Sequence, residues 1–144
     1  MLRAGMIERF KQAVPIVHEL IRDLEWLQDE FNPETATEKE RTYAKHLMTL
    51  GCNCFDEADW RLKRMFKSVG VQGRLVRNCN GRFEIEGTDT EFTCGSCCEV
   101  YAPYFSDDEG WMTWIPTAIE YDKDYYFTAR SKIPVEGALV RVKG

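Results

Sequence analysis

The spacing of apolar residues in this chain changes near Gly73, and the change divides the fold into two halves. Across residues 6–31, apolar side chains recur every three or four positions, which is the spacing of one face of an α-helix. After Gly73, short runs rich in aromatic and β-branched residues alternate with turn residues, which is typical of β-strands. The two patterns predict an α+β protein, with a helical region at residues 1–70 and a small β-domain at residues 71–144.

The first half is expected to contain three helices. The first covers residues 6–31, with a kink or a break near Pro15, which lacks a backbone N–H. Residues 37–40 read Thr-Glu-Lys-Glu and match a capping box, which predicts a second helix over residues 38–50. Gly51 follows directly and is predicted to be the C-terminal cap of that helix.

A third helix is expected over about residues 55–68, and short strands follow it. Asn80-Gly81 is a strong hairpin signal, because both positions of the favoured two-residue turn require a positive φ angle. Strands of this length and spacing predict a small antiparallel β-barrel, on which the helical hairpin or three-helix segment would pack. The expected strands cover residues 74–77, 82–86, 91–94, 97–102, 111–121, 125–129 and 139–142.

The charge of the chain argues against direct binding of nucleic acid. Its 24 Asp and Glu residues outnumber 19 Lys and Arg residues and give a net charge of −5, whereas a phosphate backbone is bound through a basic field. The acidity favours a protein partner with a basic surface, and the alternative is that it only keeps the protein in solution. The sequence shows neither an apolar run of the roughly 18 residues that a membrane span needs nor a signal peptide. We therefore expect a protein that stays in the cytoplasm of the cell that makes it, without membrane contact.

Cysteines are the strongest candidates for a chemical site. The chain has six, and a reducing cytoplasm disfavours disulfides, whereas suitably spaced thiolates hold zinc in tetrahedral geometry. Cys94 and Cys97 form a Cys-x-x-Cys pair with two small residues between them. Cys52 and Cys54 would supply the other two ligands, and Cys79 would substitute for one of these. Such a zinc ion would be structural and would fasten the helices to the barrel.

Strand alternation separates Cys98 from this predicted zinc site. Cys98, Val100 and Ala102 should point to one face of a strand and Cys97 to the other, so Cys98 is expected in the core. Two alternatives to zinc stay open: six reduced thiols, some of them buried as small hydrophobic residues, or a thiol–disulfide redox pair.

No catalytic motif stands out, and we expect a protein that is not an enzyme. The chain has two histidines and lacks the sequence signatures of serine hydrolases, phosphate-binding loops and zinc proteases. Two acidic segments rich in aromatic residues instead suit binding to an Arg- and Lys-rich groove, if the two loops lie together. The alternative is a pair of solvated turns over a Trp-rich core. The candidate partner-binding residues are Asp107, Asp108, Glu109 and Trp111 in one segment and Asp122 and Asp124 in the other.

The C-terminal half resembles a family of short, uncharacterised β-domains carried on phages, plasmids and integrative elements of Gram-positive bacteria. That family has no established chemistry, so the resemblance implies a fold and a genomic habitat only. The stretches that carry it are Gly73-Arg74-Leu75-Val76, Gly81-Arg82-Phe83-Glu84-Ile85, Phe92-Thr93-Cys94-Gly95, Glu99-Val100, Ile119-Glu120-Tyr121, Tyr125-Tyr126-Phe127 and Glu136-Gly137-Ala138-Leu139-Val140-Arg141.

In size, acidity and lack of catalytic motifs, the chain also looks like the small inhibitors of CRISPR nucleases that such elements encode. This likeness implies a non-enzymatic inhibitor of a host protein complex. The first expectation is an anti-CRISPR protein that blocks nucleic-acid loading by a type II, RNA-guided nuclease. The alternative is an accessory module that binds nucleic acid or a scaffold protein during the element's own replication or transfer.

Overall fold

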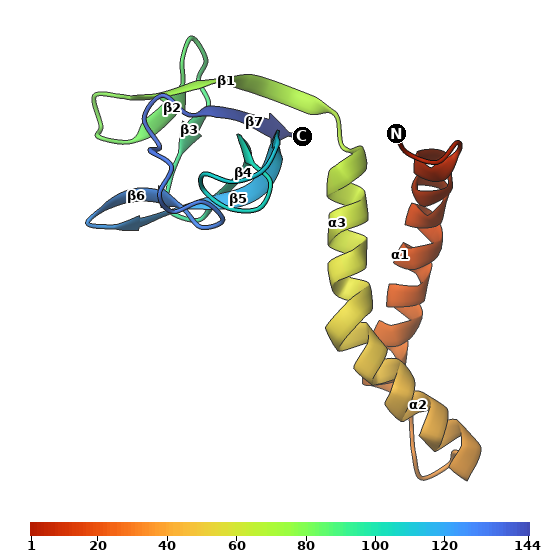
Figure 1. Cartoon of the computed structure of the whole chain (residues 1–144). Helices are drawn as coiled ribbons and strands as arrows, with labels where there is room; N and C mark the ends of the chain where they lie inside the picture. Colours follow the sequence, from red (N-terminus) through yellow and green to blue (C-terminus); the bar gives the residue numbers. More distant parts are fainter. The chain divides into compact units, whose positions relative to one another are not determined.

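A computed structural model describes the backbone of all 144 residues and every side chain except those of Cys52 and Asn53. The chain divides into two compact units, Met1–Lys67 and Ser68–Gly144. The first unit contains the helices and the second contains the strands (Figure 1). Among the described residues, no helix has the length and apolar character required to cross a bilayer.

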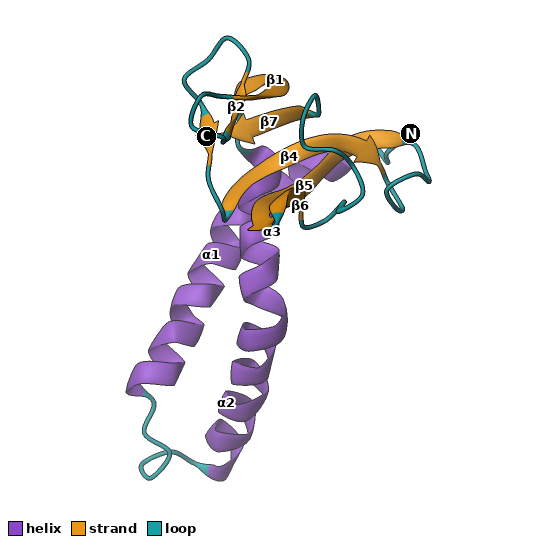
Figure 2. Cartoon of the chain, turned by 90° about the vertical axis from the view of Figure 1, so that its left-hand side faces the viewer, coloured by secondary structure: helices purple, strands orange, loops and turns teal.

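The helical unit is a hairpin. Helix α1 (Met6–Glu30) runs alongside one continuous helical stretch made of α2 (Glu38–Leu50), a five-residue π-helical segment, η1 (Gly51–Phe55), and α3 (Asp56–Phe66). Figure 2 shows the two arms side by side, joined by the loop before α2. The sequence predicts either a helical hairpin or a three-helix segment, and the structure has the hairpin.

The start of α2 confirms the predicted capping box. The Thr37 hydroxyl accepts a hydrogen bond from the backbone N–H of Glu40 at 3.2 Å, and the Glu40 carboxylate accepts one from the N–H of Thr37 at 2.8 Å. Each side chain satisfies a backbone donor that the first helical turn would leave free. Helix α1 runs through Pro15 without a break.

Gly51 takes the C-cap position of α2, as the sequence predicts, but without the left-handed conformation of a glycine cap. Its φ and ψ angles of −58° and −55° are right-handed helical, and its carbonyl accepts a hydrogen bond from the N–H of Asp56. A Cβ at this position would lie 3.0 Å from Cδ1 of Leu24 on α1. Glycine is therefore explained by the close approach of the two arms of the hairpin, since here it does not adopt the left-handed conformation of a cap.

The second unit is one antiparallel sheet of seven strands in the order β3-β2-β1-β7-β4-β5-β6. The sheet is curled, and its edge strands β3 and β6 are not neighbours in this fully described unit, so the small antiparallel barrel that the sequence predicts takes the form of an open half-barrel. The strands are β1 (Val69–Arg77), β2 (Phe83–Ile85), β3 (Glu91–Phe92), β4 (Ser96–Pro103), β5 (Met112–Asp122), β6 (Asp124–Phe127) and β7 (Leu139–Lys143).

The concave side of the sheet holds the core of this unit. Its members come from all seven strands and from the connection before β7, and they include Cys98, which is 1% exposed, as the alternation along its strand predicts. Glu99 departs from that alternation. It is buried, although Cys97 and Tyr101, which are expected on the same face of the strand, are exposed. The Glu99 carboxylate accepts a hydrogen bond from Nε of Arg141 at 2.6 Å and lies 3.8 Å from Nζ of Lys143, so its charge is paired.

Candidate protein-binding site

The connection between β4 and β5, residues 104–111, carries a cluster of three aromatic side chains, and we call this connection the hook. The ring of Tyr104 stacks on that of Trp111, with centroids 4.7 Å apart and planes 18° apart. Phe105 meets both rings edge-on, each at 5.1 Å between centroids. Such offset-stacked and edge-on pairs are favourable geometries for aromatic rings, so the three side chains support one another.

Backbone hydrogen bonds fix the shape of the hook. The N–H of Tyr104 donates to the carbonyl of Trp111 at 2.9 Å, and the N–H of Phe105 donates to that of Glu109 at 2.9 Å. Gly110 has a φ of +111°, and a Cβ there would lie 3.0 Å from the backbone nitrogens of Tyr104 and Phe105. Only glycine fits this turn without strain.

The base of the hook is held by Arg130, which lies after β6. Its guanidinium donates to the carbonyl of Pro103 from Nε at 3.1 Å and from Nη2 at 2.9 Å, and to the carbonyl of Tyr104 from Nη2 at 2.6 Å. Charged donors make stronger hydrogen bonds than neutral donors do. Hydrogen bonds thus hold the hook both at its turn and at its base.

The hook is apolar and exposed at the same time. Tyr104, Phe105 and Trp111 are between 50% and 62% exposed, and Met112, the first residue of β5, is 49% exposed. A pre-ordered aromatic cluster on the surface offers a large contact area at a small cost in conformational entropy. This combination is typical of the anchor residues of protein interfaces.

Carboxylates border the aromatic cluster. Asp108 and Glu109 are exposed at the tip of the hook and Asp107 is half-buried, while the Ser106 hydroxyl donates to Asp108 at 3.1 Å. These three acidic residues and Trp111 are four of the six partner-binding residues that the sequence predicts, and the structure brings them together.

The other two predicted residues lie elsewhere. Asp122 and Asp124 flank the turn between β5 and β6, whereas the hook precedes β5. The eleven residues of β5 separate the two loops by roughly 30 Å, because a strand rises about 3.3 Å per residue. Asp124 also has an internal partner, since its carboxylate lies 3.2 Å from Nη2 of Arg77. The two acidic loops therefore do not form one surface.

Aromatic side chains continue from the hook along the convex face of β4 and β5. Tyr101 pairs with Trp114 across these strands, with ring centroids 5.1 Å apart. The guanidinium of Arg141, the residue that pairs with Glu99, lies 4.4 Å from the centre of the Trp114 ring. The Trp114 ring thus makes a cation–π contact with Arg141. Tyr101, beside the hook, is 39% exposed.

The predicted zinc ligands belong to both units of the chain. Cys54 belongs to η1 in the helical unit, Cys79 lies in the β1–β2 turn, and Cys94 and Cys97 lie at the start of β4; all four are exposed, free thiols. Cys52, the fifth candidate, lies outside the residues whose side chains are described. Within the described part of the chain, no group of three or more His, Cys, Asp or Glu side chains could hold a metal ion.

The surroundings of Cys94 also oppose the thiolate form that zinc requires. Its Sγ donates to Oε2 of Glu120 at 2.8 Å. This hydrogen bond to a carboxylate raises the pKa of the Cys94 thiol, although a backbone hydrogen bond involving Tyr121 acts in the opposite direction. Zinc binding thus stays a prediction, which metal analysis of protein purified without added zinc would check; about a tenth of an equivalent or less would contradict it.

Three residues that build the hook were missed by sequence reasoning. Tyr104 and Phe105 directly precede the acidic segment, so the local run of aromatic residues was an available signal. Arg130 lies 26 residues beyond Tyr104, and no local pattern connects the two.

The comparisons with known proteins bear on the sheet unit alone. Residues 73–142 match the model of a family described as a domain of unknown function, DUF5348. The match begins within β1 and ends within β7, so it spans the sheet and contains the hook. It supports the resemblance of this half to a small, uncharacterised domain family. Neither a curated protein nor a solved structure gives a significant match.

Proposed function

We propose that this chain is a non-enzymatic binding protein that docks a basic protein partner through the hook. The observation that carries the proposal is the ordered, exposed cluster of Tyr104, Phe105 and Trp111 with carboxylates at its border. The rings would supply the buried centre of the interface. Asp108 and Glu109 would lie at its rim and steer association with Lys and Arg side chains.

The cations of the sheet unit support a protein over a nucleic acid as the partner. This unit has eight Lys and Arg residues against twelve Asp and Glu residues, 8 − 12 = −4. Six of the eight cations contact carboxylates or backbone carbonyls of the same unit, which leaves few for phosphates. These six are Arg74, Arg77, Arg82, Arg130, Arg141 and Lys143.

A narrower proposal names the class of partner. A protein encoded by a phage or another mobile element would gain from occupying the basic channel of a host nuclease that normally holds guide or target nucleic acid. An acidic hook with an aromatic anchor suits such a channel, and occupancy would prevent loading of the RNA-guided nuclease. The support is the chemistry of the hook, together with the mobile-element habitat that the resemblance implies.

The experiment is affinity capture from lysate of a bacterial host, followed by mass spectrometry and by measurement of Kd with the captured partner. Trp111→Ala should weaken binding roughly 30-fold, the effect of losing an interface anchor worth about 2 kcal/mol. Trp60→Ala is the matched control, because Trp60 is an exposed tryptophan of helix α3, outside the hook. Equal affinities of the two variants would exclude the hook as the contact.

Salt and charge reversal test the electrostatic part of the proposal. Replacing Asp107, Asp108 and Glu109 by Lys should slow association and remove most of its dependence on ionic strength. Glu136→Lys, at an exposed position of the same unit, serves as the control. Capture of proteins without a basic surface, or salt-dependent binding of bare DNA by the wild type, would contradict the proposal and favour the accessory nucleic-acid module.

A further inference from the structure

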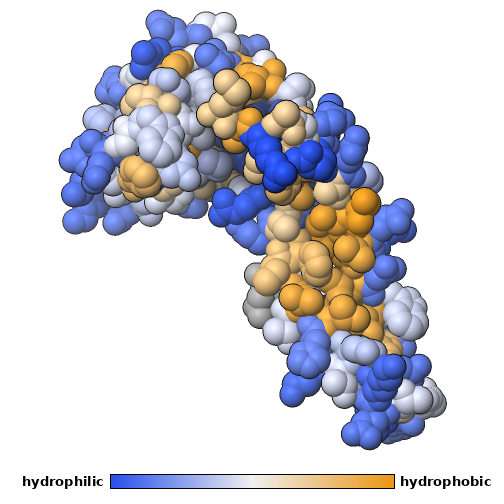
Figure 3. Space-filling view, turned by 45° about the vertical axis from the view of Figure 1, so that its right-hand side comes forward, coloured by the Kyte–Doolittle hydropathy of each residue, from blue (hydrophilic) through white to orange (hydrophobic). Residues whose placement is uncertain are grey.

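One face of the helical hairpin carries an apolar groove built from two adjoining hollows. The first, of about 430 Å³, is lined mainly by leucines of α1 and α2 and by Phe55. The second, of about 460 Å³, continues toward the loop between the helices and is lined by Phe31, Tyr43 and Ala44 among others. Trp26, Leu27 and Leu47 line both hollows, so the two form one strip. Figure 3 shows a continuous hydrophobic area on the helical unit.

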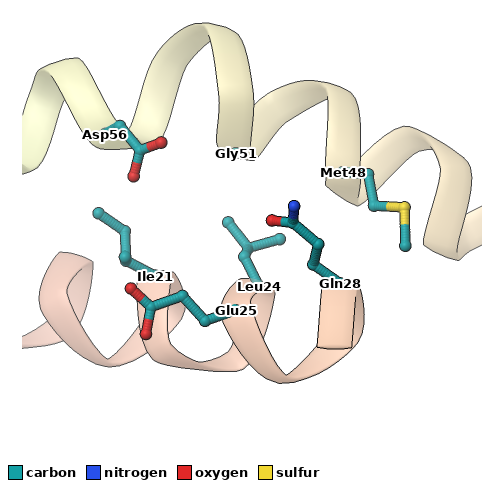
Figure 4. Close-up of a pocket in the computed structure, with 7 residues that line it drawn as sticks. All are labelled: Ile21, Leu24, Glu25, Gln28, Met48, Gly51 and Asp56. Atoms are coloured by element: carbon teal, nitrogen blue, oxygen red, sulfur yellow. The ribbon is translucent and has the colours of Figure 1, made fainter. Parts of the chain in front are cut away.

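The other side of the same seam is mixed in character. Figure 4 shows a smaller hollow between α1 and the α2–α3 arm, lined by the polar side chains of Glu25, Gln28 and Asp56 and by the apolar side chains of Ile21, Leu24 and Met48. Leu24 lines both this hollow and the apolar groove. At 100° per residue, Glu25 and Gln28 lie on one side of Leu24, and Leu20 and Leu27 lie on the other. The groove is therefore the more apolar side of this seam, because Glu25, Gln28 and Asp56 lie on the opposite side.

This face leaves the helical unit with a thin core. Among its described side chains, the buried apolar residues are Ile21, Leu27 and Ala44. Leu20, Trp26, Tyr43, Leu47 and Leu50, by contrast, are between 40% and 58% exposed along the groove. An apolar strip of this size on a two-helix hairpin is typical of a surface that a further element covers.

We propose that the groove is covered by the same face of a second copy of this chain, which gives a four-helix bundle. In a two-fold pair with its axis parallel to the helices, α1 of one copy packs on α2 of the other. The exposed parts of the five side chains amount to about 500 Å² per copy, so the pair would bury roughly 1,000 Å², about the minimum for a specific interface.

Charged side chains also line the groove. Asp23 and Glu30 of α1 and Glu40 of α2 lie among its lining residues, and Nζ of Lys39 on α2 lies 5.7 Å from the centre of the Tyr43 ring. Packing of α1 on α2 of the second copy would bring the Lys39 cation to the acidic side of α1, twice in each dimer. The helical unit has 11 basic and 12 acidic residues, 11 − 12 = −1, so repulsion between two copies is weak.

Sedimentation of the full chain tests the proposal. The wild type should sediment at twice the chain mass of 16.8 kDa at micromolar concentration. Leu47→Glu should sediment as a monomer with unchanged far-ultraviolet circular dichroism, because it places a charge in the centre of the groove. Ile7→Glu, an exposed apolar position of α1 outside the groove, should still dimerise.

A milder variant keeps the test informative if Leu47→Glu does not fold. Trp26→Gln removes an indole that is 58% exposed, and it should raise the dimer Kd roughly 30-fold, as loss of an interface anchor does. Trp60→Gln should leave the Kd unchanged. A wild-type chain that sediments at 16.8 kDa up to about 100 µM, or equal Kd values for the two tryptophan variants, would overturn the proposal. A monomer that instead binds a helix of another protein in the groove would overturn it as well.

Discussion

The guanidinium of Arg130 donates a hydrogen bond to the carbonyl oxygen of Tyr104 at 2.6 Å, so a residue that follows β6 holds the base of the hook between β4 and β5. The same side chain also binds the carbonyl oxygens of Pro103 and Ala129. It therefore satisfies three carbonyl groups where regular strand pairing ends. The order of the aromatic cluster depends on this contact between segments that are distant in sequence.

Arg130→Met should loosen the hook while keeping the aliphatic part of the side chain. We expect a loss of about 1–3 kcal/mol in the free energy of unfolding, because part-buried carbonyls lose a charged donor. Urea denaturation measures this loss, and hydrogen exchange at the amides of Tyr104 and Phe105 should become faster. Lys132→Met, at an exposed position two residues away, is the control. Unchanged protection of both amides in Arg130→Met would contradict the role of Arg130.

Two glycines of β1 provide a matched pair for testing the packing of the sheet. A Cβ on Gly73 would lie 2.7 Å from Cγ2 of Ile85, which is fully buried, whereas a Cβ on Gly70 would make an ordinary contact of 3.5 Å. Gly73→Ala should destabilise the protein by about 1–3 kcal/mol, the usual cost of overpacking a core. Gly70→Ala should change stability by less than about 0.5 kcal/mol. Equal denaturation midpoints for the two variants would contradict this account.

The elements that the sequence predicts well are those fixed by local chemistry. The capping box at Thr37 and Glu40 requires only residues three positions apart, and the burial of Cys98 follows from alternation along one strand. The carboxylates and Trp111 of the hook could be predicted as one binding segment for the same reason, because they are close together in the sequence.

The features that sequence reasoning missed depend on contacts between distant segments. The sequence predicts Gly51 as the cap of α2, but not its right-handed helical conformation or its close approach to Leu24 of α1. The burial of Glu99 depends on Arg141, which is 42 residues away. The length of β5 sets the distance between the two acidic loops, and composition alone suggested that they could share a surface. In each case the residue that determines the outcome lies on another element or at the other end of the same strand.

The sheet unit should become less stable in acid, because two of its carboxylates become protonated. A hydrogen bond from Arg82 lowers the pKa of Glu91, with further help from Asn78. The backbone N–H of Tyr125, and then Arg77, lower the pKa of Asp124. A carboxyl group with a lowered pKa in the folded state contributes stability above its unfolded pKa, and this contribution is lost as the pH falls through the folded pKa.

The double variant Glu91→Gln, Asp124→Asn should therefore be less stable than the wild type at pH 7. The difference should shrink at pH values below about 4, the ordinary range of carboxyl pKa values. Thermal unfolding between pH 7 and pH 2 measures both effects. Asp122→Asn, on the other side of the same turn, is the control for loss of an exposed carboxylate. A difference that stays constant over the whole range would show that neither carboxylate contributes through its ionised form.

The pairing of Cys94 with Glu120 should make this thiol less reactive than an ordinary exposed cysteine. The Glu120 carboxylate accepts a hydrogen bond from the thiol and repels the thiolate, and both effects raise the pKa of Cys94. Glu120→Gln removes the negative charge, so the pKa of Cys94 should fall and its alkylation by iodoacetamide should become faster near pH 8. Mass spectrometry of the modified peptides measures the rate at each cysteine, and Cys79, exposed in the β1–β2 turn, is an internal control whose rate should not change. An unchanged pH profile at Cys94 would mean that the carboxylate does not govern the thiol. A faster rate at Cys94 alone would make Glu120→Gln the better form for measuring zinc binding, because zinc requires the thiolate that Glu120 disfavours.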